Sequence, residues 1–252
     1  MNPCKAFFAT AATLSVLMVS TAAQAVTVTL RSDLTDDGFR SLLTNGDFSE
    51  SFVAESRMGR PRADRQVGIN SPIVPNGNGG FTGGNPFSQG TTQGFTTWEK
   101  GKAVQFSLEY TGSVINYIVN NVTLSTTAVT GAVNGMFIRT FAGATGSTSS
   151  LTNLVLQGFG GIPDLTSNAS TNKVNYLQIS GITAPFKITG ESTFNWTGTQ
   201  PTGSNIAYQI KAGNFSEPSP EPVPEPITMV GMGLGLSGLA AARSRRKEQK
   251  VS

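Results

Sequence analysis

The chain has 252 residues, with 18 basic and 15 acidic side chains, one cysteine and no histidine. The absence of histidine excludes a Ser-His-Asp triad, and a lone cysteine, Cys4, excludes a disulfide within the chain. Six of the cations lie in the two terminal segments, so residues 26–226 hold 12 basic against 14 acidic side chains. Nucleic-acid binding requires a basic face on the folded body, and we therefore expect no nucleic-acid partner.

An apolar run near the start predicts a secretory signal peptide over 1–25. "AFFATAATLSVLMVST" follows Lys5 and leads into "AAQA", which places small residues at Ala23 and Ala25. A charged start, an apolar core and a small-x-small motif are the layout of a cleaved export signal. We predict handling by the export machinery and cleavage after Ala25. An uncleaved anchor or a buried helix is the alternative.

Residues 26–94 predict a strand, short helices and a mobile loop. "VTVTL" alternates like a strand, and Asp33 or Thr35 can cap a short helix that Asn45-Gly46 ends. "DFSESFVAES" predicts a second helix. Residues 70–94 are rich in Gly, Asn and Pro, which predicts a long mobile loop. A cluster of arginines before it is either a solvated segment or a docking patch for an anionic surface: Arg57, Arg60, Arg62 and Arg65.

Residues 95–212 form the predicted β body. Short runs rich in Val, Ile, Thr, Phe and Tyr are separated by Gly, Asn or Pro. Apolar side chains alternate with polar ones, as in sheets with one buried face, for example at Val104, Phe106, Leu108 and Tyr110. The fold class is therefore mainly β, an antiparallel β-sandwich or jelly roll, with short N-terminal helices and a C-terminal hydrophobic helix.

Few carboxylates in the β body could act as catalytic residues. A glycoside hydrolase needs a pair of them, and the acids between 95 and 212 are Glu99, Glu109, Asp164 and Glu191. No spacing rule selects any of these, so we predict no catalytic residue and no enzyme activity. A carboxylate-dependent glycosidase using Glu99 or Glu191 is the less favoured alternative.

Other acidic residues could supply oxygen ligands for calcium. Calcium takes six to eight oxygens, and the candidates are Asp36, Asp37, Asp47, Glu50 and Asp164. Helix capping and turn formation explain these residues more simply. We therefore predict no metal and no cofactor.

The aromatic side chains of the body suggest a second function, a carbohydrate-binding module. Trp98 and Trp196, with Tyr117 and Tyr176, could form a platform on which sugars stack. Packing in the core or across strands is the alternative role for such side chains.

The end of the chain changes composition twice. Residues 213–226 form a Pro- and Glu-rich spacer, and residues 227–252 combine an uncharged Gly-rich stretch with a basic end. As a helix, Ile227 to Ala242 would measure about 24 Å, against a bilayer core of about 30 Å. This predicts a marginal transmembrane helix with its basic end in the cytoplasm and the body exported.

The order "VPEP", apolar stretch, "RSRRK" resembles the PEP-CTERM sorting signal of bacteria that make exopolysaccharide. The resemblance implies processing by an exosortase, a membrane enzyme, and it favours the second of two Pro-Glu-Pro copies. The Asn-, Gly- and Thr-rich body is also similar to exported cyanobacterial PEP-CTERM proteins. The matching residues are Val223, Pro224, Glu225, Pro226, Arg243, Arg245, Arg246 and Lys247.

Together these patterns predict an exported surface or extracellular-matrix protein with a structural or adhesive role. Its C-terminal helix anchors it in the membrane before processing, after which it lies at the cell surface or outside the cell. Exopolysaccharide is a candidate partner.

Overall fold

The computed structural model describes residues 25–58, 66–182 and 185–216. The chain divides into two units, 1–214 and 215–252, and nearly all described residues belong to the first. Most of the predicted signal peptide, the greater part of the spacer and the predicted transmembrane helix lie outside the described residues.

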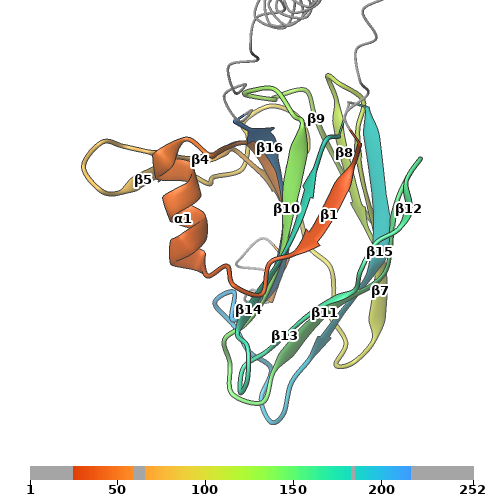
Figure 1. Ribbon diagram of the computed structural model, residues 1–252. Helices are drawn as coiled ribbons and strands as arrows, with labels where there is room; N and C mark the ends of the chain where they lie inside the picture. The colour runs from red at the N-terminus through yellow and green to blue at the C-terminus, as the bar shows by residue number, and fades with distance from the viewer. Residues whose placement is uncertain (1–24, 59–65, 183–184, 217–252) are drawn as a thin grey trace, which may run out of the picture. The chain divides into compact units, whose positions relative to one another are not determined.

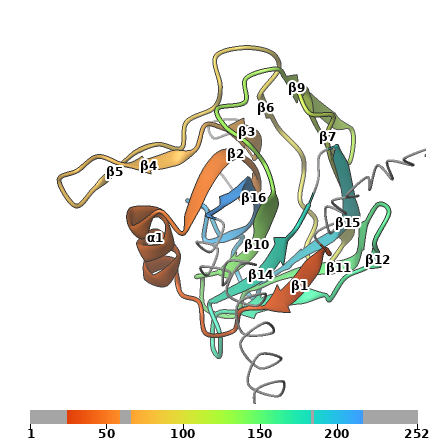
Figure 2. The same ribbon diagram turned by 45° about the horizontal axis from the view of Figure 1, so that its top comes forward.

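Two antiparallel sheets make up the body and face each other, as Figures 1 and 2 show. The first has the order β1-β14-β10-β16-β2-β3-β6, and the second has the order β12-β11-β15-β7-β8-β9 with β13 paired to β11. The predicted antiparallel β-sandwich is confirmed. Strands of the first sheet are β1 (Thr27–Leu30), β2 (Phe48–Arg57), β3 (Val67–Asn70), β6 (Gln93–Gly94), β10 (Gly135–Ala142), β14 (Val174–Ser180) and β16 (Ile206–Phe215). Strands of the second are β7 (Ala103–Tyr110), β8 (Ile115–Val119), β9 (Val122–Thr126), β11 (Thr148–Leu156), β12 (Gly160–Gly161), β13 (Leu165–Asn168) and β15 (Phe186–Asn195).

The core lies between the sheets and contains a short chain of hydroxyl groups. Alternate residues of β7, from Val104 to Tyr110, face inward as the sequence pattern predicts. Tyr117 of the second sheet donates a hydrogen bond to Tyr208 of the first at 2.8 Å, and Ser56 lies 2.8 Å from the Tyr117 hydroxyl. Burial raises the pKa of Tyr208 to about 12, so these hydroxyls remain neutral and link the two sheets within the core.

The first predicted helix is confirmed and the second is wrong. Helix α1 (Asp36–Asn45) begins after Thr35, whose Oγ1 accepts a hydrogen bond from Gly38 N, and ends at Gly46 with φ 78°. The stretch "DFSESFVAES" is strand β2 instead. Most of β2 is buried, and a strand covered on both faces lacks the polar–apolar alternation that identifies an exposed sheet.

The segment 26–94 belongs to the sandwich. Strands β1, β2, β3 and β6 are all in the first sheet, so the boundary expected after residue 94 falls within one fold. The predicted mobile loop 70–94 contains a hairpin, β4 (Ile73–Pro75) with β5 (Phe81–Gly83). Asn76 Oδ1 closes its turn by accepting hydrogen bonds from Asn78 N and Gly80 N.

Candidate functional site: a charged pocket beneath helix α1

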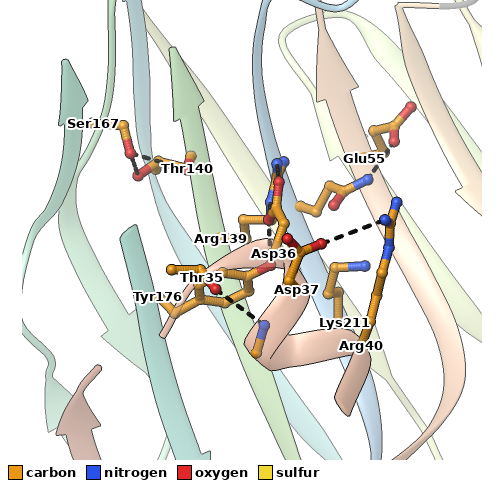
Figure 3. A network of polar contacts seen from close by, with 12 residues as sticks. Thr35, Asp36, Asp37, Arg40, Glu55, Arg139, Thr140, Ser167, Tyr176 and Lys211 are labelled. Carbon is orange, nitrogen blue, oxygen red and sulfur yellow. Dashed lines mark hydrogen bonds and ion pairs between the residues drawn. The ribbon is translucent and has the colours of Figure 1, made fainter. Parts of the chain in front are cut away.

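Helix α1 packs on the outer face of the first sheet through one aromatic residue. Phe39 stacks on Tyr176 with ring centroids 5.5 Å apart and meets Phe137 edge-on at 5.3 Å. The outer face carries these side chains because their neighbours Leu177 and Ile138 point into the core. The helix therefore rests on β14 and β10 and covers polar side chains of the same face, as Figure 3 shows.

The first turn of the helix is joined to the sheet by an ion pair. Arg139 of β10 donates to both oxygens of Asp36, from Nε at 2.7 Å and from Nη2 at 2.5 Å, and the Tyr176 hydroxyl donates to Oδ1 at 2.7 Å. Burial alone would raise the pKa of Asp36, but the bonds from Arg139 and Tyr176 outweigh it and lower that pKa below its ordinary value. Burial raises the pKa of Tyr176. Asp36 is thus held as a carboxylate and Tyr176 as a neutral donor.

A second, more deeply buried ion pair joins the sheet to the β4–β5 hairpin. Lys211 Nζ of β16 lies 2.9 Å from Glu50 Oε1 of β2, with the side chains 8 % and 0 % exposed. The other oxygen of Glu50 accepts a hydrogen bond from Ile73 N at 2.8 Å. The Lys211 ammonium also lies 4.9 Å from the ring centroid of Phe39. Lys211 and Glu50 therefore connect the sheet, the helix and the hairpin.

A third carboxylate, Glu55 of β2, lies near these two ion pairs and also lines the pocket. Gln209 Nε2 donates to its Oε2 at 2.6 Å, and Arg57 Nε lies 3.3 Å from its Oε1. Arg57 in turn donates to Ser204 Oγ at 2.9 Å. This places one member of the sequence-predicted arginine cluster in the fold rather than in a solvated segment; the other three lie outside the described residues.

These side chains surround a pocket of about 280 Å³ between α1, the hairpin and the sheet. Figure 2 shows the helix and the hairpin together on the outer side of the first sheet. The lining of the pocket combines carboxylates, cations, amides and a few apolar groups, which suits a small polar molecule. The lining residues are Asp36, Phe39, Arg40, Glu50, Val53, Glu55, Asn70, Ile73, Gly84, Arg139, Tyr176, Gln209 and Lys211.

The aromatic platform predicted from the sequence is not formed. Trp98 and Trp196 are only 4 % and 6 % exposed, and Trp98 packs on Phe194 at 4.3 Å between centroids. Tyr117 and Tyr176 are buried as well. Sugar stacking needs an open ring face, so the assignment of Trp98 and Trp196 as sugar-binding residues is wrong; both are core residues.

Glu99 and Glu109 lie apart from the other carboxylates weighed for catalysis, whereas Asp164 and Glu191 lie on either side of Asn153. Glu99 pairs with Lys102 at 2.8 Å in solvent, and Glu109 lies opposite Lys187 in the ladder of β7 and β15. Asn153 joins the other two by donating from Nδ2 to Glu191 and from its backbone N to Asp164. Glu99 and Glu191 line different hollows on the second sheet.

Of the residues weighed for calcium, Asp36 and Glu50 line the same pocket beneath α1. Asp36 and Glu50 are each paired with a cation, Asp37 lies 3.7 Å from Arg40, and Asp164 is on the second sheet. Across residues 25–58, 66–182 and 185–216, no group of three or more His, Cys, Asp or Glu side chains could hold a metal ion.

Arg139 and Lys211 are functional candidates that sequence reasoning missed. Each is a lone cation within a strongly apolar strand, in "GMFIRTFA" and "IAYQIKAGNF". A charged residue on a strand normally indicates a solvated face. Here nearly every neighbour on the strand is apolar and buried. A lone cation in such an apolar strand was the sequence signal that could have identified Arg139 and Lys211.

The comparison with protein families matches residues 222–247 to the PEP-CTERM protein-sorting motif. The chain carries a PEP-CTERM sorting signal. It is therefore an exported protein that an exosortase sorts to the surface. The matched residues include the second Pro-Glu-Pro copy, Pro224 to Pro226, and begin after Pro220 and Glu221 of the first.

The PEP-CTERM motif follows the folded body directly. Strand β16 lies between β10 and β2 and ends at Phe215, seven residues before the match begins. In the described part of the chain, no helix has the length and apolar character needed to cross a membrane. No curated protein matches this chain.

Proposed function

We propose that this chain is a non-enzymatic structural component of the cell surface or extracellular matrix, delivered and then released through its PEP-CTERM signal. The observation that supports this proposal best is the position of the motif relative to the fold. The last strand in the chain, β16, is in the middle of a sheet and ends at Phe215, within the first residues of the predicted spacer. Cleavage at Pro224–Pro226 therefore removes no strand that the structure describes.

The start of the body also supports export followed by processing. Strand β1 begins at Thr27, directly after the cleavage site predicted at Ala25, and Val26 packs against the core. Removal of a signal peptide there leaves β1 complete. In this proposal the uncharged stretch 227–242 holds the chain in the membrane until the exosortase acts on the spacer, and the basic residues Arg243 to Lys250 stay in the cytoplasm.

Substitution of the motif in the native host tests the sorting step. Replacing Pro224, Glu225 and Pro226 by alanine should leave the protein in the membrane fraction with its tail attached. The matched control replaces Pro220 and Glu221 of the first copy, which precede the matched residues, and should sort normally. Normal sorting of the first variant would refute the assignment of the second copy.

The structural role has a separate test. A strain lacking this chain should lose cohesion of its surface layer or matrix, and the wild-type chain should restore it. Restoration should fail with the Pro224–Pro226 variant, because its body folds but is not released. Unchanged cohesion in the deletion strain would contradict a structural role.

A further inference from the structure

The first and last strands of the body meet the same end of the first sheet. Thr27, at the start of β1, pairs with Ser180 of β14, and Ser180 pairs with Gly135 of β10. Gly135 pairs in turn with Gly213, near the end of β16. These residues form one row across the sheet, so the start of β1 and the end of β16 lie about 14 Å apart at the usual strand spacing. Figure 1 shows both strands reaching this end of the sandwich, which we call the terminal end.

The loops at the terminal end carry almost no charge. In the second sheet, the row from Phe186 through Tyr110 and Ile115 to Thr126 lies at the same end, because a short loop joins β14 to β15 there. The described loop residues beside the two rows are 46–47, 111–114, 127–134, 157–159 and 181–182. Asp47 is the only charged residue among them. Phe159 is 48 % exposed in one of these loops, so the terminal end presents apolar and uncharged polar groups.

The opposite end of the sandwich, where β1 ends and β7 and β14 begin, differs in charge. Its loops carry Arg31, Asp33, Glu99, Lys100, Lys102 and Lys173. Removing a charged side chain from water is costly, whereas covering exposed apolar surface is favourable. The terminal end can therefore approach a lipid surface at low cost, and the opposite end remains in water.

The lengths of chain that flank the body connect the terminal end to the membrane. The apolar run of the predicted signal peptide ends at Thr21, six residues before Thr27. Six extended residues span at most about 20 Å, which is less than the length of about 30 Å expected for the ten-residue strand β15. The uncharged C-terminal stretch begins at Ile227, twelve residues after Phe215. With both segments in the membrane, neither chain end has to cross the body to reach it.

We propose that the terminal end of the sandwich contacts the lipid bilayer while the precursor is held in the membrane, with the opposite end directed away from it. This inference rests on the proposed function, because it requires both flanking segments to lie in the membrane. It adds a partner for the body, the lipid surface, and an orientation in which the sandwich completes its folding before either segment is removed. Cleavage at both ends then frees this surface.

Quenching of a fluorescent label by nitroxide-labelled phospholipid measures which end faces the bilayer. The full chain, synthesised in a cell-free system without signal peptidase, is reconstituted into vesicles of phosphatidylethanolamine and phosphatidylglycerol. One label is attached at Ser113→Cys in the terminal end or at Thr171→Cys in the opposite end, each in a Cys4→Ser background; both positions are exposed. The label at position 113 should lose most of its fluorescence, and the label at position 171, about 30 Å away along the strands, should keep it.

Flotation of the vesicles separates this inference from the proposed function. Chain that does not float with the vesicles would refute membrane attachment and, with it, the contact proposed for the terminal end. Chain that floats but shows equal quenching at positions 113 and 171, or stronger quenching at 171, would overturn the inference alone.

Two matched variants distinguish contact with lipid from tethering of the chain ends. Phe159→Glu places a charge in the terminal end and should reduce the quenching of the label at position 113. Phe95→Glu is the control, since Phe95 is 54 % exposed and follows β6, at the edge of the first sheet opposite to β1. It should leave the quenching unchanged. Wild-type quenching in Phe159→Glu would show that the terminal end does not contact the lipid.

Discussion

Lys211 of β16 and Glu50 of β2 form an ion pair of 2.9 Å in which the glutamate side chain is fully buried. Because Glu50 also accepts the backbone N–H of Ile73, the pair links two neighbouring strands to the hairpin outside them. A buried carboxylate that loses its cation is strongly destabilising, whereas an exposed pair contributes little. This contrast provides the first prediction.

Lys211→Met should destabilise the body by about 3–5 kcal/mol, because it leaves Glu50 charged and unpaired by any cation. The matched control is Lys102→Met, which breaks the exposed Lys102–Glu99 pair of similar length and should change stability by about 0–1 kcal/mol. Urea unfolding of both variants gives the comparison. Equal effects would show that the Lys211–Glu50 pair is not buried as described.

The ion pair at the first turn of α1 predicts a pH dependence. The pKa of Asp36 is lowered in the folded state, so its contribution to stability is complete above the unfolded value of about 4 and is lost as the pH falls through the folded value. Asp36→Asn should therefore be less stable than the wild type at about pH 7. The difference should shrink as the pH falls below about 4, the ordinary pKa of an aspartate. A difference independent of pH would contradict the assigned ion pair.

Helix α1 should depend on its N-cap. Thr35→Ala removes the acceptor of the Gly38 N–H and should lower the free energy of unfolding by about 1 kcal/mol. Thr44→Ala removes an exposed threonine inside the same helix and should be neutral or slightly stabilising. Chemical unfolding of the two variants separates capping from a general effect of losing threonine.

Trp98 should behave as a core residue. Trp98→Ala should destabilise the body by about 3–5 kcal/mol, because the indole packs on Phe194 within the core. Urea unfolding measures the change, and an unchanged free energy of unfolding would contradict the core position of Trp98.

The sequence predicted the elements whose pattern is local. Alternation from Val104 to Tyr110 predicted strand β7. Asn45-Gly46 predicted the end of α1, and of the two caps predicted for its start, Asp33 or Thr35, the structure has Thr35. Strand β2 was misread because burial on both faces removes its alternation. The Gly- and Asn-rich composition of 70–94 likewise concealed a hairpin whose turn is held by Asn76.

The candidate site could not be predicted from the sequence for a different reason. Asp36 and Glu50 come from the consecutive elements α1 and β2, but Arg139 and Lys211 come from β10 and β16, far along the chain. The strand order of the first sheet brings the four together. The two tryptophans show the opposite error, because their chemistry suggested a surface role and the fold places them in the core. The C-terminal motif was recognisable because it depends on residue order within a short segment.

The mass of the mature protein at the surface of the native host tests the central claim most directly. The account predicts a protein that begins at Val26 and ends in the spacer near Pro224–Pro226, without Arg243–Ser252. Mass spectrometry of the intact protein and of its C-terminal peptide measures this. Surface-exposed protein that retains Arg243–Ser252 would contradict the account.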